Sequence, residues 1–173
     1  QKLRQALDLD PNSAYARIDY SSYLVFIGRF EDAIREAKRA LKSDPVSVVA
    51  NRSLSFVYCF ARRYRDSAAQ ASATLEIAPG TGMALFDLAW AYALQGMRDE
   101  APARVDEGSL NLVQKTVVLA TLGDSERARR PFEQFSEQLK QQTWEEYEYT
   151  FDTAVIHAAV GETDAAFEWL ERA

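Results

Sequence analysis

The side chains that could support catalysis are few, and the densest group of them is acidic. The segment from Trp144 to Asp152 reads WEEYEYTFD and contains four carboxylates. Paired carboxylates carry out general acid and base chemistry when their surroundings separate their pKa values. Nothing in the sequence separates the pKa values of these carboxylates. Glutamates are also stabilised at the start of a helix by its dipole. In addition, Trp144, Tyr147 and Phe151 have the spacing of an apolar stripe. The segment is therefore interpreted as the beginning of a helix.

The chain has one cysteine, Cys59, and one histidine, His157. These are too few soft ligands for a structural zinc site. We expect Cys59 to behave as a small buried hydrophobe and His157 to pack between the two helices of the last unit. There is no glycine-rich phosphate loop. The sequence thus predicts no enzymatic activity, no metal and no cofactor.

Composition narrows the class of protein further. The chain of 173 residues is 47% hydrophobic and 27% charged, which is ordinary for a globular domain. Its net charge of −6 disfavours phosphate backbones, so we expect no direct contact with nucleic acid. The apolar stretches fall short of the roughly 20 residues that span a bilayer, and no signal peptide is visible. The lone cysteine fits a reducing cytoplasm, which is the predicted location.

A repeat of fixed length organises the chain. Pro11, Pro45 and Pro79 lie 34 residues apart, twice over. A leucine precedes each proline by four positions, and a small residue precedes each leucine. A constant period of this length is typical of stacked helical arrays.

Glycine marks the middle of each unit. Four glycines are followed five residues later by alanine, and Arg62 and Ser67 fill the same two positions in the intervening unit; the glycines are Gly28, Gly96, Gly123 and Gly161. Glycine suits the C-terminal cap of a helix, and proline ends the following helix. The apolar periodicity predicts the first pair of helices over residues 14–27 and 30–42.

These positions resemble the tetratricopeptide repeat in length, in the spacing of small, large, glycine and alanine residues, and in the terminal proline. The resemblance implies an all-α, right-handed solenoid of stacked antiparallel helix pairs. The expected units are the second helix of a truncated repeat (1–13), full repeats (14–47 and 48–81), a shortened repeat (82–108), a degenerate repeat (109–146) and a final repeat (147–173).

The C-terminal half is expected to be irregular. Only 27 residues separate Gly96 from Gly123, which predicts a short second helix near Pro102. Pro131 lies inside a helical pattern, where we expect it to kink or split the helix. Both ends of the chain stop in the middle of the pattern, so we expect a piece of a longer protein.

In the repeat family the first helix of each pair lines the concave face, so the resemblance places a partner-binding surface there. An exposed apolar patch usually marks a binding surface, and a groove between helices could hold an amphipathic helix or an extended peptide. Core packing, or packing against another domain of the same chain, stays open as the alternative. The predicted residues are Tyr15, Ile18, Asp19, Phe26, Arg52, Phe56, Phe60, Phe86, Asp87 and Trp90.

Two functions follow as hypotheses. The first is a non-catalytic protein–protein interaction scaffold that binds a peptide or helix of its partner in the concave groove. The second is a regulatory, sensing or oligomerisation module of a larger bacterial signalling protein. It rests on the final repeat, which resembles the closing repeat of arrays that follow winged-helix transcription regulators and class III nucleotide cyclases. The sequence predicts no particular oligomeric state.

Overall fold

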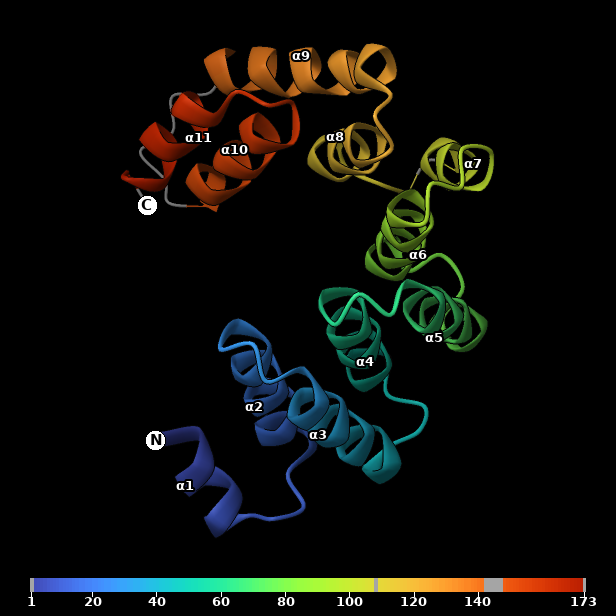
Figure 1. The fold of residues 1–173 in the computed structure, drawn as a ribbon, viewed down its shortest axis with the longest axis vertical. Helices are drawn as coiled ribbons and strands as arrows, with labels where there is room; N and C mark the ends of the chain where they lie inside the picture. The colour runs from blue at the N-terminus through green and yellow to red at the C-terminus, as the bar shows by residue number, and fades with distance from the viewer. Residues whose placement is uncertain (1, 108, 142–147, 173) are drawn as a thin grey trace. The chain divides into compact units, whose positions relative to one another are not determined.

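The computed structural model describes residues 2–107, 109–141 and 148–172, and all regular secondary structure in them is α-helical (Figure 1). The chain divides into two compact units, Gln1–Ala91 and Tyr92–Ala173. Within the units, α2 packs on α3, α4 on α5, α8 on α9 and α10 on α11. The helices are α1 (Lys2–Leu9), α2 (Ala14–Phe26), α3 (Phe30–Ser43), α4 (Val48–Phe60), α5 (Tyr64–Ile77), α6 (Gly82–Leu94), α7 (Glu100–Asp106), α8 (Leu112–Thr121), α9 (Ser125–Gln141), α10 (Glu148–Ala159) and α11 (Thr163–Leu170).

Side-chain caps fix where α2 and α4, the first helices of the two full repeats, begin. The Ser13 hydroxyl accepts a hydrogen bond from the backbone N–H of Ala16, and Ser47 does the same for Ala50, both at 3.3 Å. Each bond satisfies one of the four backbone donors that a helix leaves unpaired at its start. The predicted helices over 14–27 and 30–42 correspond to α2 and α3, with a difference of one residue at each C-terminal end.

The turns inside the helix pairs share one backbone conformation. Gly28 follows α2 with φ +74°, and the N–H of Arg29 then donates to the carbonyl of Leu24 at 2.8 Å. Arg62 adopts φ +59° in the corresponding turn after α4, where Arg63 donates to Tyr58 at 2.9 Å. The prediction that Arg62 fills the glycine position is therefore confirmed, although this conformation is unfavourable for an L-residue.

Small residues let the helices of a pair approach closely. Ser55 of α4 and Ser67 of α5 are both fully buried. Each hydroxyl donates to the other residue's backbone carbonyl, at 3.0 Å from Ser55 and 2.9 Å from Ser67. The reciprocal bonds satisfy polar atoms that would otherwise be costly to bury. Beside this contact, the core of α2, α3 and α4 is built around Leu24, Ile34 and Val57.

Unit 2 departs from the regular pattern in two helices. α7 has 7 residues, against 14 in α3 and in α5. α9 runs through Pro131 without a break over 17 residues, so Pro131 does not split this helix, and the kink expected as the alternative stays a prediction. Ala128, Pro131 and Phe135 are all buried, at a spacing that puts them on one helix face. Packing of this face on the core, where Phe135 meets Val113 and Ile156, holds both halves of α9 together despite the lost backbone bond.

None of the helices in the described ranges combines the length and the hydropathy that crossing a membrane requires.

Candidate functional site

Four aromatic rings from α4 and α6 gather on one surface of unit 1. Phe56 and Phe60 come from α4, Phe86 and Trp90 come from α6, and we call the group the α4–α6 aromatic cluster. Each pair is spaced four residues apart, which places both rings on the same face of their helix. The ring centroids of Phe56 and Phe60 are 4.5 Å apart, those of Phe86 and Trp90 are 5.8 Å apart and nearly parallel, and Phe60 meets Trp90 edge-on at 6.1 Å.

The α4–α6 aromatic cluster is only partly covered by protein. Phe60 is 39% exposed, and the other three rings are half-buried. Aromatic pairs at these distances contribute about 0.5–1.5 kcal/mol beyond the area that they bury, so the rings hold one another in place. The result is an ordered apolar surface that solvent still reaches.

An ion pair joins the same two helices as the cluster. Arg52 Nε donates to Asp87 Oδ2 at 2.9 Å, and the Asp87 side chain is 11% exposed. Burial raises the pKa of Asp87, and the charge and hydrogen bond of Arg52 oppose that rise. The pair thus places two mutually neutralised charges next to four apolar rings.

The predicted residues of α2 lie apart from these ring contacts. Tyr15 and Phe26 are 73% and 76% exposed, Asp19 is exposed and Ile18 is half-buried. α2 itself packs on α4, where the hydroxyls of Ser21 and Ser53 are 3.3 Å apart. Of the ten predicted binding residues, the structure therefore brings four rings into contact with one another and joins Arg52 to Asp87, and it leaves the four of α2 as a separate, more exposed set.

Sequence reasoning missed one aromatic pair of unit 1. Tyr20 and Tyr23 stack with ring centroids 6.2 Å apart, and Tyr23 is 45% exposed. Their spacing of three residues within one helix was the available signal.

Cys59 matches its prediction as a buried hydrophobe. It is 7% exposed, and burial, assisted by the negative charge of Asp87, raises the pKa of its thiol to about 12. The thiolate that nucleophilic chemistry needs is therefore scarce at neutral pH.

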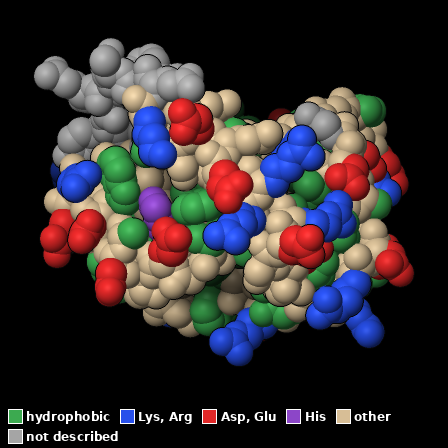
Figure 2. Space-filling view, turned by 90° about the horizontal axis from the view of Figure 1, so that it is seen from above, with side chains coloured by type: hydrophobic (Ala, Val, Ile, Leu, Met, Phe, Trp, Pro, Cys, Tyr) green, Lys and Arg blue, Asp and Glu red, His purple; other side chains and the backbone are tan. Residues whose placement is uncertain are grey.

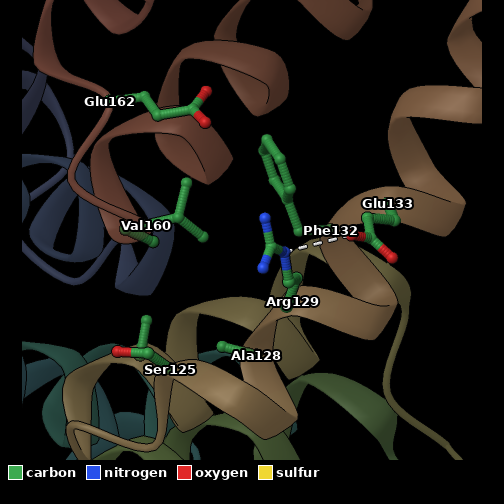
Figure 3. A pocket seen from close by; sticks show the side chains of 9 residues that line it. Ser125, Ala128, Arg129, Phe132, Glu133, Val160 and Glu162 are labelled. Carbon is green, nitrogen blue, oxygen red and sulfur yellow. Dashed lines mark ion pairs between the residues drawn. The ribbon is translucent and has the colours of Figure 1, made fainter.

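A separate cavity of about 320 Å³ lies in unit 2, between α8, α9 and the turn that follows α10. In Figure 3, Phe132, Val160 and Glu162 point toward the same space, and Arg129 pairs with Glu133 at its edge with an Nε to Oε1 distance of 3.1 Å. The walls are partly apolar and partly charged.

His157 lies near this cavity. Its ring meets Phe132 of α9 edge-on at 5.3 Å, and its Nδ1 is 2.7 Å from Glu162 Oε2 in the turn before α11. His157 of α10 thus contacts both α9 and the N-cap residue of α11, and its packing between the two helices of the last unit stays a prediction.

The structure describes only part of the acidic segment from Trp144 to Asp152. Trp144, Glu145, Glu146 and Tyr147 lie outside the described residues, and α10 begins at Glu148. Phe151 is 62% exposed, so it does not continue a buried stripe, and burial raises the pKa of Asp152. Within the part of the chain that the structure describes, no three His, Cys, Asp or Glu side chains are placed to hold a metal ion.

Comparison with known proteins identifies the fold. No family model matches the sequence, and no curated protein matches it at a significant level. Among solved structures, the Cut9–Hcn1 hetero-tetramer of APC/C contains a chain with a TM-score of 0.68 and 16% identity, over 98% of this chain and 35% of that one. This chain therefore spans about a third of that relative's length.

Two similar structures are described as tetratricopeptide (TPR) proteins. YrrB, a TPR protein with an unusual peptide-binding site, has a TM-score of 0.57 and 16% identity, over 99% of this chain and 90% of that one. TTC0263, a thermophilic TPR protein of Thermus thermophilus, has a TM-score of 0.61 and 16% identity, over 92% and 89%. The chain thus has the all-α fold of tetratricopeptide solenoids.

Proposed function

We propose that the chain is a non-catalytic protein–protein interaction scaffold, in which unit 1 holds a peptide or helix of its partner against the α4–α6 aromatic cluster. The observation that carries the proposal is the partial exposure of four mutually packed rings. An ordered, solvent-accessible aromatic surface gains free energy when a partner covers it, and little conformational entropy is lost because the rings already restrain one another.

The chemistry of the surface specifies the kind of segment it would hold. The rings favour apolar or aromatic side chains of the partner. Arg52 and Asp87 neutralise each other, whereas Asp19 adds a carboxylate on α2 together with the exposed rings of Tyr15 and Phe26. The preferred partner is therefore an amphipathic segment with apolar anchors and a basic residue, and Ile18 completes the surface that α2 contributes.

The known structures support the class of function. YrrB is described as having a peptide-binding site, and Cut9 is crystallised in a complex with Hcn1. These descriptions belong to those proteins, and their likeness to this chain is in the fold. The proposal for this chain rests on its own aromatic surface.

The regulatory, sensing or oligomerisation role is the second candidate, and one observation favours it. Unit 2 exposes large apolar side chains on its last two helices, with Phe151 and Phe167 each 62% exposed and Leu170 45% exposed. Such side chains suit contact with another copy or with an attached domain. In that case the final repeat serves the regulation of a larger signalling protein.

Peptide selection tests the leading proposal. A displayed library of random peptides is selected on the whole chain, and the affinity of each recovered peptide is then measured by isothermal titration calorimetry. We expect Phe86→Ala, Trp90→Ala to weaken binding at least tenfold, because it removes two adjacent rings of the cluster. Circular dichroism establishes that the variant is folded.

The matched control is Phe151→Ala, Phe167→Ala, which removes two exposed aromatic rings of unit 2. It is expected to leave the affinity unchanged. Selected peptides that lose affinity only in this control would shift the site to unit 2 and favour the second candidate. A selection that returns no peptide, or peptides that bind all three proteins equally, would contradict a peptide site at the cluster.

A further inference from the structure

A depression of about 320 Å³ in unit 1, lined by residues of α1, α2, α3 and the turn after α2, is rich in arginine. Sequence reasoning did not single it out. Its charged lining residues are Arg17, Arg29, Asp32, Arg35, Glu36 and Arg39. Among the lining residues that the structure describes, four guanidinium groups thus face two carboxylates, an excess of two positive charges in a chain whose net charge is −6.

Each carboxylate holds two of the guanidinium groups. Asp32 contacts both Arg29 and Arg35. Glu36 accepts from Arg17 Nη1 at 2.6 Å through one oxygen and from Arg39 Nη1 at 2.8 Å through the other. The Glu36 side chain is only 10% exposed. Because both of its oxygens are occupied, it fixes the two arginines that flank it.

The next repeat keeps only one of these ion pairs, that of Arg63 with Asp66. The residues 34 positions further on are Asn51, Arg63, Asp66, Ala69, Gln70 and Ala73. There a neutral hydrogen bond of 2.6 Å between Gln70 and Asn51 replaces the ion pair of Glu36 with Arg17, and alanine replaces both Arg35 and Arg39. The accumulation of arginine is therefore particular to the first full repeat.

Three of the arginines retain donors for a further acceptor. The side chains of Arg29, Arg35 and Arg39 are 54–56% exposed, and among the described residues each pairs with one carboxylate. A guanidinium group has five N–H donors in a planar fork that matches the oxygens of a phosphate group. Arg17, which also donates to the carbonyl of Pro11, is more deeply placed and anchors the cluster.

We propose that this arginine cluster binds a phosphate group, carried either by a small phosphate compound or by a phosphoserine side chain. Several guanidinium forks around one depression provide the multidentate, charge-assisted hydrogen bonds that a dianionic phosphate needs. The site is local, whereas recognition of a nucleic-acid backbone needs a basic stripe. It lies apart from the aromatic cluster, so neither proposal depends on the other.

NMR titration of arginine Nε–Hε resonances tests the proposal, with inorganic pyrophosphate and free O-phosphoserine as separate probes and citrate as a carboxylate control. We expect saturable shifts at Arg29, Arg35 and Arg39 with either phosphate probe. Arg35→Gln, Arg39→Gln should weaken binding at least tenfold, and glutamine keeps the helix propensity high. Arg65→Gln, Arg98→Gln is the matched control, since it removes the same charge at two exposed positions.

Pyrophosphate binding alone would assign the site to small phosphate compounds, and binding of both probes would assign it to the phosphate group itself. Equal affinity for citrate would overturn the preference for phosphate. Shifts that stay linear, or that are alike in all three proteins, would overturn the site as a whole. If the double variant fails to fold, the position of the shifts in the parent protein still decides, because a phosphate site predicts saturable shifts at these three arginines and not elsewhere.

Discussion

At the scale of single residues, Arg62 stands where four other turns have glycine. Its φ of +59° lies in the left-handed region, as do the φ values of Gly28, Gly96, Gly123 and Gly161. The glycines have open space where a Cβ would lie, so a side chain there costs only backbone strain. Arg62 carries that strain in the native protein.

Arg62→Gly is therefore expected to stabilise the protein. The left-handed conformation costs a non-glycine residue about 1–2 kcal/mol, and the greater freedom of glycine in the unfolded chain offsets about 0.5–1 kcal/mol of that. The net gain in the free energy of unfolding should be about 0.5–1 kcal/mol, measured by urea denaturation. Gly28→Ala is the mirror experiment and should be destabilising; a gain there, or a loss in Arg62→Gly, would contradict the strain.

Residue environments were predictable where the repeat fixed them and not elsewhere. The repeat position implied the left-handed turn at Arg62, and the neighbouring core residue implied the burial of Cys59. The contact of His157 with Glu162 depends on the path of a turn, and the raised pKa of Asp152 depends on its burial in the fold. Neither follows from spacing along the chain.

At the scale of helices, the ion pair between Arg52 and Asp87 links α4 to α6 across 35 residues. Both residues were predicted as concave-face positions, but their pairing was not. The sequence spacing could have indicated the pairing. A separation of one 34-residue repeat plus one residue places Arg52 and Asp87 at neighbouring positions on the first helices of successive repeats. The same applies to the four rings, whose mutual distances depend on how far each helix is rotated and not on the pattern alone.

Arg52→Met is expected to destabilise the protein by about 1–3 kcal/mol at pH 7, the cost of leaving a buried charged partner unsatisfied. Burial already raises the pKa of Asp87 above its ordinary value of 3.8, and loss of Arg52 raises it further. The folded protein then binds this proton more tightly than the unfolded chain, so the destabilisation should shrink as the pH falls toward 3.8. Urea denaturation at pH 7 and at pH 5 measures both values.

Arg65→Met serves as the control for this variant, because Arg65 is exposed on α5. Its free energy of unfolding should change by no more than about 0.5 kcal/mol at either pH. A destabilisation by Arg52→Met that did not depend on pH would mean that the pKa of Asp87 does not change when Arg52 is lost.

Helix positions were predicted well in unit 1 and less well in unit 2. Regular prolines and glycines bounded α2 and α3 to within one residue. Pro131 does not split α9; the sequence pattern showed the missing backbone donor but not the buried face that holds the helix together. Tertiary packing outweighed the local cost of proline there.

At the scale of the whole molecule, the net charge differs from the local charge of the arginine cluster. Acidic and basic side chains are mixed over the face shown in Figure 2. The net charge is nevertheless −6, while the described residues of the arginine cluster in unit 1 carry an excess of two positive charges. Composition gives the negative net charge and argued against a basic stripe. It could not reveal the cluster, because the arginines gather only when α2 and α3 pack together.

The solubility of the chain should pass through a minimum near pH 4.9, its sequence pI. Charge repulsion between molecules vanishes there, while exposed apolar side chains such as Phe26, Phe151 and Phe167 remain available for association. Light scattering between pH 4 and pH 8 at low ionic strength would show the effect. Scattering that stays flat through pH 4.9 would mean that these side chains do not drive association.

The single thiol of the chain has a further use. Cys59 is 7% exposed and lies beside the ring cluster, at the end of α4. A thiol reagent can reach it only when this part of unit 1 opens, so the rate of labelling in native buffer reports an opening equilibrium without any engineered probe. A ligand that covers the cluster would slow the labelling. The labelling rate of Cys59 therefore measures how often this part of unit 1 opens.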